Sequence, residues 1–414
     1  MNCLTSKELR RMKNVPDIRF MSFDEEWNEQ KAEVIFRQFI EKNRPDLPVL
    51  SATQDRGMVT RKAIGYDISH DKRNECTYKH ILPGQFVIHL RSFQGGFAHS
   101  DIEGIASPAY TVFEFRDKNQ HNDIFWKYIF SSKSFIKQLE KITYGIRDGR
   151  SISFDEFKEM KFFIPCVEEQ HQIASYFRQL DIQISEQEKR IVKLKQLKSA
   201  CLISMFPQQG ETVPRVRFKG FNGEWKKKKL NSFASRITRK NSKLESKLPV
   251  TISALNGIIE QTMFFNNIVA SSNLSGYYLM KKGEFAYNKS YSCGFPFGAV
   301  KRMDRYEMGA LSNLYIVFKL EDTVCDDYIL YLFETSTWHK EVSMRASEGA
   351  RNHGLLNIGA EDFLDIDIWV PNDKAEQHQI ASYFRNLDIQ ISEQEKRLEK
   401  LKQIKAACLD KMFV

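Results

Sequence analysis

One long segment occurs twice in this chain of 414 residues. Residues 169–206 read EQHQIASYFRQLDIQISEQEKRIVKLKQLKSACLISMF, and residues 376–413 read EQHQIASYFRNLDIQISEQEKRLEKLKQIKAACLDKMF. The offset is a constant 207 residues, and seven of the 38 aligned positions differ. Such a close repeat, once in each half, predicts two similar structural units that each end in the same segment.

The repeated segment is predicted to be a helix with a coiled-coil seam. Apolar residues recur in steps of three and four, with Gln187 at the one position that breaks the pattern, and neither proline nor glycine interrupts it. The seam residues are Ile173, Phe177, Leu180, Ile184, Ile191 and Leu194, and in the second copy Ile380, Phe384, Leu387, Ile391, Leu398 and Leu401. A 38-residue helix is roughly 57 Å long. Two copies with one seam are expected to pack together, and the long stretch between them allows an antiparallel pair; the alternative is two unrelated surface helices.

Each half also begins with the same short motif. A proline, an arginine, a phenylalanine and a tryptophan recur with a shift of 198 residues, as Pro16, Arg19, Phe20 and Trp27 and as Pro214, Arg217, Phe218 and Trp225. Between this motif and the helix, alternating runs at 110–115 and 315–320 predict strands, and 125–130 and 328–333 predict short helices. We therefore expect an α/β (α+β) globule in each half. The predicted division is globule 1–167 with a loosely ordered lead-in at 1–13, helix 168–206, globule 207–374 and helix 375–414.

Composition limits the environment and the partners. The formal net charge is +9, and each long helix carries only +1 of it, so the excess lies in the globules and suits a polyanion. Seven cysteines without a C-x-x-C pair argue against a disulfide scaffold or a zinc site and for a reducing compartment. No apolar run approaches the length of a membrane span, so we expect a cytoplasmic protein with no membrane partner.

Two pairs of loops carry residues suited to DNA contact. The first pair holds Arg91 and Ser92 in one half and Lys289, Ser290 and Tyr291 in the other. A cation, a hydroxyl and an aromatic ring on a glycine-bearing loop are able to contact a phosphate and a base edge. An ordinary strand-end loop remains an equal alternative.

The second pair of loops shares the pattern G-x-R-[DN] before a final strand. It holds Arg147 and Arg150 in the first half and Arg351 and Asn352 in the second. Arginine bridges guanine O6 and N7, and asparagine bridges adenine N6 and N7, so these residues are candidate base readers. The alternative is a tight turn closed by the side chain of the Asp or Asn.

No motif for catalysis is evident in the sequence. It has no glycine-rich nucleotide-binding motif, P-loop, zinc-ligand cluster or Pro-Pro dipeptide of an amino methyltransferase. We therefore assign no catalytic and no metal-binding residue, and we expect no cofactor in this chain.

The P-x-h-R-F opening, the variable globule and the E-Q-x-x-I-A-x-x-F-x-x-L-D start of a long helix all occur twice. As a set they resemble the specificity subunit of type I restriction–modification systems, over essentially the whole chain. The resemblance implies a non-catalytic subunit whose two target recognition domains each read one half of a bipartite, asymmetric duplex DNA site. It implies that the coiled coil sets the gap between the halves and docks the modification subunits.

The resemblance also implies partner subunits. It implies a prokaryotic cytoplasm as the location, where DNA binding would associate the protein with the nucleoid. Two modification subunits would bind S-adenosylmethionine and methylate adenine. Two restriction subunits would use ATP and Mg to translocate and cut DNA. A different class of function, a scaffold or adaptor whose globules bind protein or carbohydrate, stays open, and a self-sufficient enzyme is disfavoured by the missing motifs.

Overall fold

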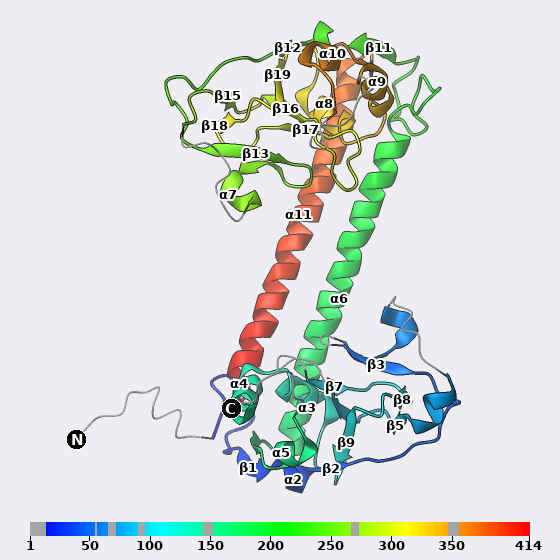
Figure 1. Ribbon diagram of the computed structural model, residues 1–414, viewed down its shortest axis with the longest axis vertical. Coiled ribbons are helices and arrows are strands. Elements are labelled where there is room, and N and C mark those ends of the chain that lie inside the picture. The colour runs from blue at the N-terminus through cyan, green and yellow to red at the C-terminus, as the bar shows by residue number, and fades with distance from the viewer. Residues whose placement is uncertain are drawn as a thin grey trace, which may run out of the picture. The chain divides into compact units, whose positions relative to one another are not determined.

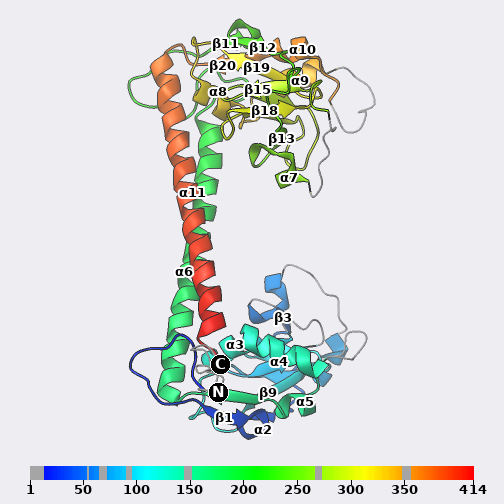
Figure 2. The ribbon, with the colours of Figure 1, turned by 90° about the vertical axis from the view of Figure 1, so that its left-hand side faces the viewer.

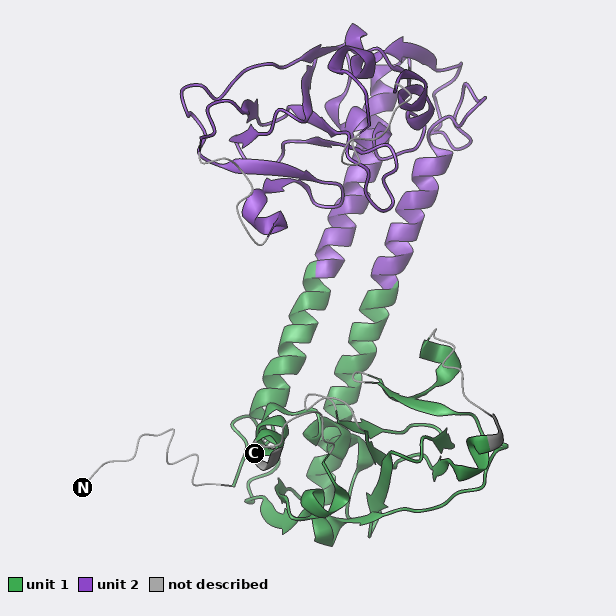
Figure 3. Cartoon of the chain, in the orientation of Figure 1, with its two compact units in different colours: residues 1–189, 396–414 green, residues 190–395 purple. Residues whose placement is uncertain are grey.

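The computed structural model describes residues 14–53, 56–64, 72–89, 96–143, 152–265, 273–346 and 356–414, so the predicted lead-in at 1–13 lies outside the described residues. The chain forms two compact units (Figure 3). Unit 1 holds residues 1–189 and 396–414, and unit 2 holds residues 190–395. The helices α6 (Val167–Ser204) and α11 (Lys374–Lys411) each contribute to both units.

Unit 1 combines short strands with short helices. Its strands are β1 (Asn28–Lys31), β2 (Phe36–Gln38), β3 (Leu50–Thr53), β4 (Gly57–Thr60), β5 (Lys79–Ile81), β6 (Phe86–Ile88), β7 (Phe97–His99), β8 (Gly104–Ala106), β9 (Thr111–Phe115) and β10 (Lys161–Ile164). Its other helices are α2 (Ala32–Ile35), α3 (Asp123–Ile129), α4 (Lys133–Thr143) and α5 (Phe154–Lys158), with 3₁₀ turns η1 (Arg61–Ile64) and η2 (Lys72–Thr77) (Figure 1).

Unit 2 repeats this pattern. Its strands are β11 (Lys226–Lys229), β12 (Ala234–Arg236), β13 (Pro249–Ser253), β14 (Gly257–Glu260), β15 (Tyr278–Lys281), β16 (Phe285–Asn288), β17 (Ala299–Arg302), β18 (Met308–Leu311), β19 (Ile316–Leu320) and β20 (Asp367–Val370). Its other helices are α7 (Gln261–Phe264), α8 (Asp326–Leu332), α9 (His339–Arg345) and α10 (Ala360–Leu364), with the 3₁₀ turn η3 (Leu230–Ser232).

The same antiparallel sheet lies at the centre of each unit. Its strand order is β2-β9-β6-β7 in unit 1 and β12-β19-β16-β17 in unit 2. Phe86 pairs with Phe113 in the first sheet and Phe285 with Phe318 in the second, each pair of rings stacked at 5.5 Å. Stacked aromatic pairs of this kind contribute about 0.5–1.5 kcal/mol beyond their burial. The expected α/β (α+β) class, in two copies, is thereby confirmed.

The core of each unit extends into the long helices. Ile173, Phe177 and Leu180 of α6 pack in the aromatic core of unit 1. Ile380 and Phe384 of α11 do the same in unit 2. Burying one such side chain stabilises the fold by about 1.5–3 kcal/mol, so the start of each helix is held by the globule that precedes it in sequence.

The seam predicted from the sequence shows graded burial. The buried members are Ile173, Phe177, Leu180, Ile191, Ile380, Phe384, Leu387 and Ile391, and the half-buried members are Ile184, Leu194, Leu398 and Leu401. The helices are antiparallel within each unit, because residue numbers rise along one as they fall along the other. In unit 1, for example, Lys405 pairs with Asp181 of α6, and Lys402, one turn earlier on α11, pairs with Glu188 further along α6 (Figure 2).

The two motifs that recur in the sequence meet at the start of each long helix. In unit 1, Arg19 Nε and Nη2 donate to the two carboxylate oxygens of Glu169, both at 2.7 Å. In unit 2, Arg217 donates in the same way to Glu376 at 2.7 and 2.8 Å. The two carboxylate side chains are only 0 % and 1 % exposed, and the helix dipole favours their negative charge near the helix N-terminus.

Two further contacts join each long helix to its globule. The glutamine after the buried glutamate accepts a backbone N–H at the start of a short helix: Gln170 from Asn122 at 3.0 Å, and Gln377 from Cys325 at 2.9 Å. In addition, an aspartate of the long helix contacts a tyrosine of the short helix and a lysine of the other long helix. These residues are Tyr128, Asp181 and Lys405 in unit 1, and Tyr331, Asp388 and Lys198 in unit 2. The phenol–carboxylate distances are 2.7 and 2.9 Å, and the ammonium–carboxylate distances are 2.5 and 2.7 Å.

Removing one partner of the buried ion pair tests how strongly the helix is anchored. We expect Glu169→Ala to lower the free energy of unfolding by about 3 kcal/mol, because it leaves Arg19 charged and largely buried without its carboxylate. The double variant Arg19→Met with Glu169→Leu should recover most of this loss, since both charges are gone. Hydrogen exchange read by mass spectrometry should show the loss in unit 1, with unit 2 as the internal reference. An equal effect of the single and double variants would contradict this account.

Candidate nucleic-acid interface

The structure describes only part of the set of residues predicted to contact DNA. Lys289, Ser290 and Tyr291 lie directly after strand β16. The remaining candidates lie outside the described residues: Arg91, Ser92, Arg147, Arg150, Arg351 and Asn352. Their predicted role stays a prediction, and the geometry of the site is therefore built from unit 2.

The segment after β16 is held by local hydrogen bonds and exposes one of its side chains, that of Tyr291. The backbone N–H of Ser290 donates to Asn288 Oδ1 at 3.0 Å, and Tyr291 is 56 % exposed. The ammonium of Lys289 lies 3.4 Å from the carbonyl oxygen of Ile358 and forms no ion pair within the described part of the chain. A cation that no carboxylate neutralises is available to a phosphate.

The two predicted reading loops of unit 2 are joined at their base. The backbone N–H of Leu356 donates to the carbonyl of Lys289 at 2.9 Å. Leu356 follows the second loop by four residues, counted from Asn352. Lys289 and Leu356, which are 67 residues apart in sequence, therefore lie side by side.

A tight hairpin continues the first loop. Ser292 and Phe295 exchange backbone hydrogen bonds of 3.3 and 2.8 Å, and Gly294 between them has a φ of +81°. Gly298 has a φ of +78°, and a Cβ there would lie 2.0 Å from the carbonyl oxygen of Asn288. Glycine is thus required at the end of this loop for both its backbone angle and the close approach.

Among the described residues, no cluster of three or more His, Cys, Asp or Glu side chains is arranged to hold a metal ion. In the same residues no helix is long and apolar enough to cross a membrane. The described loop of unit 2 can bind a ligand through the charge of Lys289, the hydroxyl of Ser290 and the exposed ring of Tyr291.

Sequence reasoning found Arg19 and Glu169 as members of recurring motifs but did not pair them. The signal was present, because each residue recurs in the second half, with offsets of 198 and 207 residues. Two positions retained in otherwise divergent halves are candidates for contact with each other. Trp27 and Trp225, which belong to the same recurring motif as the arginines, are both 2 % exposed and lie in the cores of unit 1 and unit 2.

Two similar α/β units, each with a long helix anchored by the same contacts, define a class of internally duplicated α/β proteins. Residues 25–196 match the sequence model of the type I restriction modification DNA specificity domain. None of the curated proteins compared with this chain matches it. The matched domain lies in the first half of the chain, and the second half is a diverged repeat of the first.

Solved structures share the fold along nearly the full length. The S subunit of a type I restriction–modification system from M. genitalium has a TM-score of 0.55 at 13% identity, covering 97% of this chain and 99% of that one. A chain from a structural study of complex assembly and conformational transition in the type I R-M system has a TM-score of 0.53 at 13% identity, covering 92% and 96%. At this identity the likeness concerns the fold.

Two glycine variants test the construction of the reading loop. Gly294→Ala should lower the free energy of unfolding by about 1 kcal/mol, the cost of the left-handed backbone, because open space surrounds the added methyl group. Gly298→Ala should cost more, since its methyl group also collides with backbone. Chemical denaturation of both variants measures the difference. Equal losses would show that the close approach at Gly298 is not a constraint.

Proposed function

We propose that this chain is the non-catalytic DNA-recognition subunit of a type I restriction–modification complex, in which each unit reads one half of a bipartite, asymmetric duplex site. The observation that carries the proposal is the combination of identical anchoring and unlike surfaces. The contacts that fix the long helices recur residue for residue in both units, from Arg19–Glu169 to Arg217–Glu376. The loops that would touch DNA differ.

The described loop of unit 2 supports contact with the duplex. Lys289 supplies charge to a phosphate, and Ser290 and Tyr291 supply hydrogen-bonding groups near a base edge. Arg351 and Asn352 belong to the loop that ends next to Lys289 through the Leu356 hydrogen bond. Reading by these residues in unit 2, and by Arg91, Ser92, Arg147 and Arg150 in unit 1, remains part of this proposal.

The long helices supply docking surfaces for two modification subunits. Ile182 and Ile389, at equivalent positions of the repeat, are 44% and 49% exposed. Leu197 and Ile404, a second equivalent pair, are 45% and 36% exposed. Apolar residues repeated at matched positions on the outer face suit two copies of one partner. These subunits would bring S-adenosylmethionine and methylate adenine, and two restriction subunits would bring the ATP- and Mg-dependent cleavage.

Variants of the predicted base readers test whether the units read independently. Arg351→Ala should relax one half of the target and Arg147→Ala the other, each by about 1–3 kcal/mol of discrimination. Long-read mapping of methylated adenines, in cells that express the variant with its modification subunits, identifies the affected half-site. Uniform weakening on all sequences would instead assign these arginines to phosphate contact.

Shortening the helices tests their role as a spacer. The heptapeptide ISEQEKR occurs at 184–190 and again at 391–397, so deleting both copies removes the same two turns from each helix and keeps the seam. The loss of roughly 10 Å corresponds to about three base pairs. We expect a shorter unspecified gap between unchanged half-sites. New half-sites with the old gap would contradict the spacer role.

A further inference from the structure

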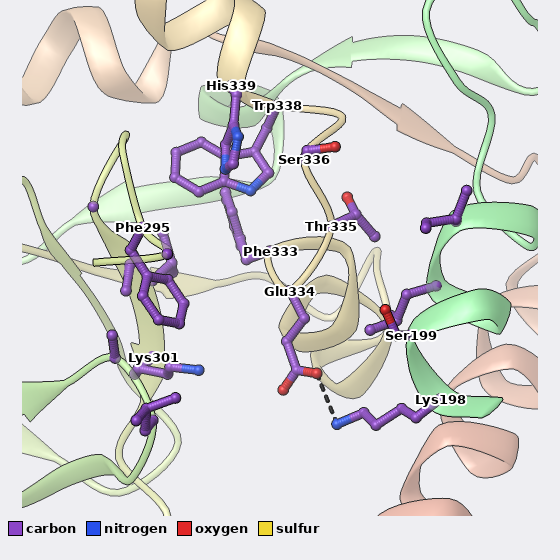
Figure 4. Close-up of a pocket in the computed structure, with 18 of the residues that line it drawn as sticks. Lys198, Ser199, Phe295, Lys301, Phe333, Glu334, Thr335, Ser336, Trp338 and His339 are labelled. Carbon is purple, nitrogen blue, oxygen red and sulfur yellow. Dashed lines mark ion pairs between the residues drawn. The ribbon is translucent and has the colours of Figure 1, made fainter. Parts of the chain in front are cut away.

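A cavity of about 490 Å³ lies within unit 2, beside the loop that follows β16 (Figure 4). Its walls come from the end of α6, from strand β17, from the connection between α8 and α9 and from residues 294–298. The last of these walls belongs to the same loop as the predicted reader Tyr291. Nothing in the recognition of base edges accounts for a cavity at this place.

Lys301 points into this cavity. Figure 4 shows its ammonium group directed from β17 toward Glu334 and Lys198 on the opposite side. Among the described residues, the ammonium group of Lys301 has no hydrogen-bond or ion-pair partner, although the residue is half-buried. Burial lowers the pKa of Lys301, which is the direction expected for an ammonium group that lacks a counter-charge in contact.

The nearby carboxylates are taken by a different lysine. Lys198 Nζ lies 2.7 Å from Glu334 Oε2 and 2.7 Å from Asp388 Oδ1. Asp388 also accepts the hydroxyl of Tyr331 at 2.9 Å. Asp388, Tyr331 and Lys198 repeat the anchor that unit 1 builds around Asp181. Glu334 has no such counterpart, because the equivalent residue of unit 1 is Ser131. Both carboxylates contact Lys198, and no ion pair joins either of them to Lys301 within the described residues.

Two aromatic side chains form another part of the wall. Trp338 is 1 % exposed, and its Nε1, which has no acceptor among the described residues, is itself buried. Its ring packs edge-on against His339, with centroids 4.7 Å apart. Burial lowers the pKa of His339, so this ring adds an uncharged surface to the wall.

The corresponding positions of unit 1 are apolar. In unit 2, Lys301 pairs with Ala286 of β16, and in unit 1 Ala98 pairs with Val87 of β6. The strand register thus makes Ala98 the equivalent of Lys301. Trp338 packs edge-on against Phe333, which follows α8, and Phe135 packs against Phe130, which follows α3. Phe135 is therefore the equivalent of Trp338. The ammonium of Lys301 is therefore absent from the sister domain, which folds without it, so the fold itself does not require it.

From these observations we infer that the cavity of unit 2 binds a phosphate group, with the ammonium of Lys301 as its counter-charge. The phosphate belongs either to the DNA backbone next to the reading loop or to a free phosphate-bearing molecule. The first source rests on the proposed function, and the second does not. In either case the occupied cavity supports the loop that carries Tyr291.

The test uses the full chain with Lys301→Ala, which places in unit 2 the residue that unit 1 already has. The control is Lys282→Ala, which removes the same charge from an exposed lysine that pairs with Glu307. In the first measurement, the Tm is followed with increasing inorganic phosphate at constant ionic strength set with chloride. The Tm of the wild-type protein and of the control should rise, and that of Lys301→Ala should not.

In the second measurement, binding to a duplex of arbitrary sequence is followed as salt increases. If the phosphate is part of DNA, Lys301→Ala lowers the slope of log K against log salt by about 0.9 relative to the control. An unchanged slope with a lost phosphate response assigns the cavity to a free phosphate compound. Variant and control behaving alike in both measurements would overturn the inference. Absence of DNA binding by the wild-type chain would refute the proposed function, while the phosphate titration would still decide the cavity.

Discussion

The bidentate ion pair between the opening arginine and the first glutamate of the long helix is the contact on which the rest of the structure depends. It joins residues 150 positions apart in unit 1 and 159 positions apart in unit 2, and it lies where the helix dipole stabilises the carboxylate. A planar guanidinium that bonds both carboxylate oxygens fixes direction as well as distance. Each globule is thereby oriented on its own helix.

This anchoring explains why the helices resemble each other more than the globules do. Nearly every polar residue retained at the start of the repeat has a partner: the glutamate an arginine, the glutamine a backbone N–H, the aspartate a tyrosine and a lysine. Substituting any of them would leave a buried polar group without its bond. The loops after the central strands differ between the two halves, as the proposed reading of two different half-sites requires.

The sequence predicted the architecture well because its strongest signals were periodic. The strands at 111–115 and 316–320 and the two long helices were evident from spacing alone. The Arg19–Glu169 pair was missed because periodicity says nothing about which distant residues meet. Lys301 gave no signal at all: a lysine in a strand is ordinary, and only the register that aligns it with Ala98 marks it as unusual. Contacts between residues far apart in sequence, and the cavities that such residues line, cannot be predicted from local sequence patterns.

The proposed function requires that two unlike units read two parts of one DNA site at a fixed separation. Long-read sequencing of modified adenines, in a host that carries this gene with its modification subunits and in the same host without the gene, measures this directly. We expect a methylated motif, present only with the gene, made of two short specified parts centred about 10 base pairs apart, one helical turn, with an unspecified stretch of constant length between them. An uninterrupted motif, or the same methylation in both hosts, would contradict it.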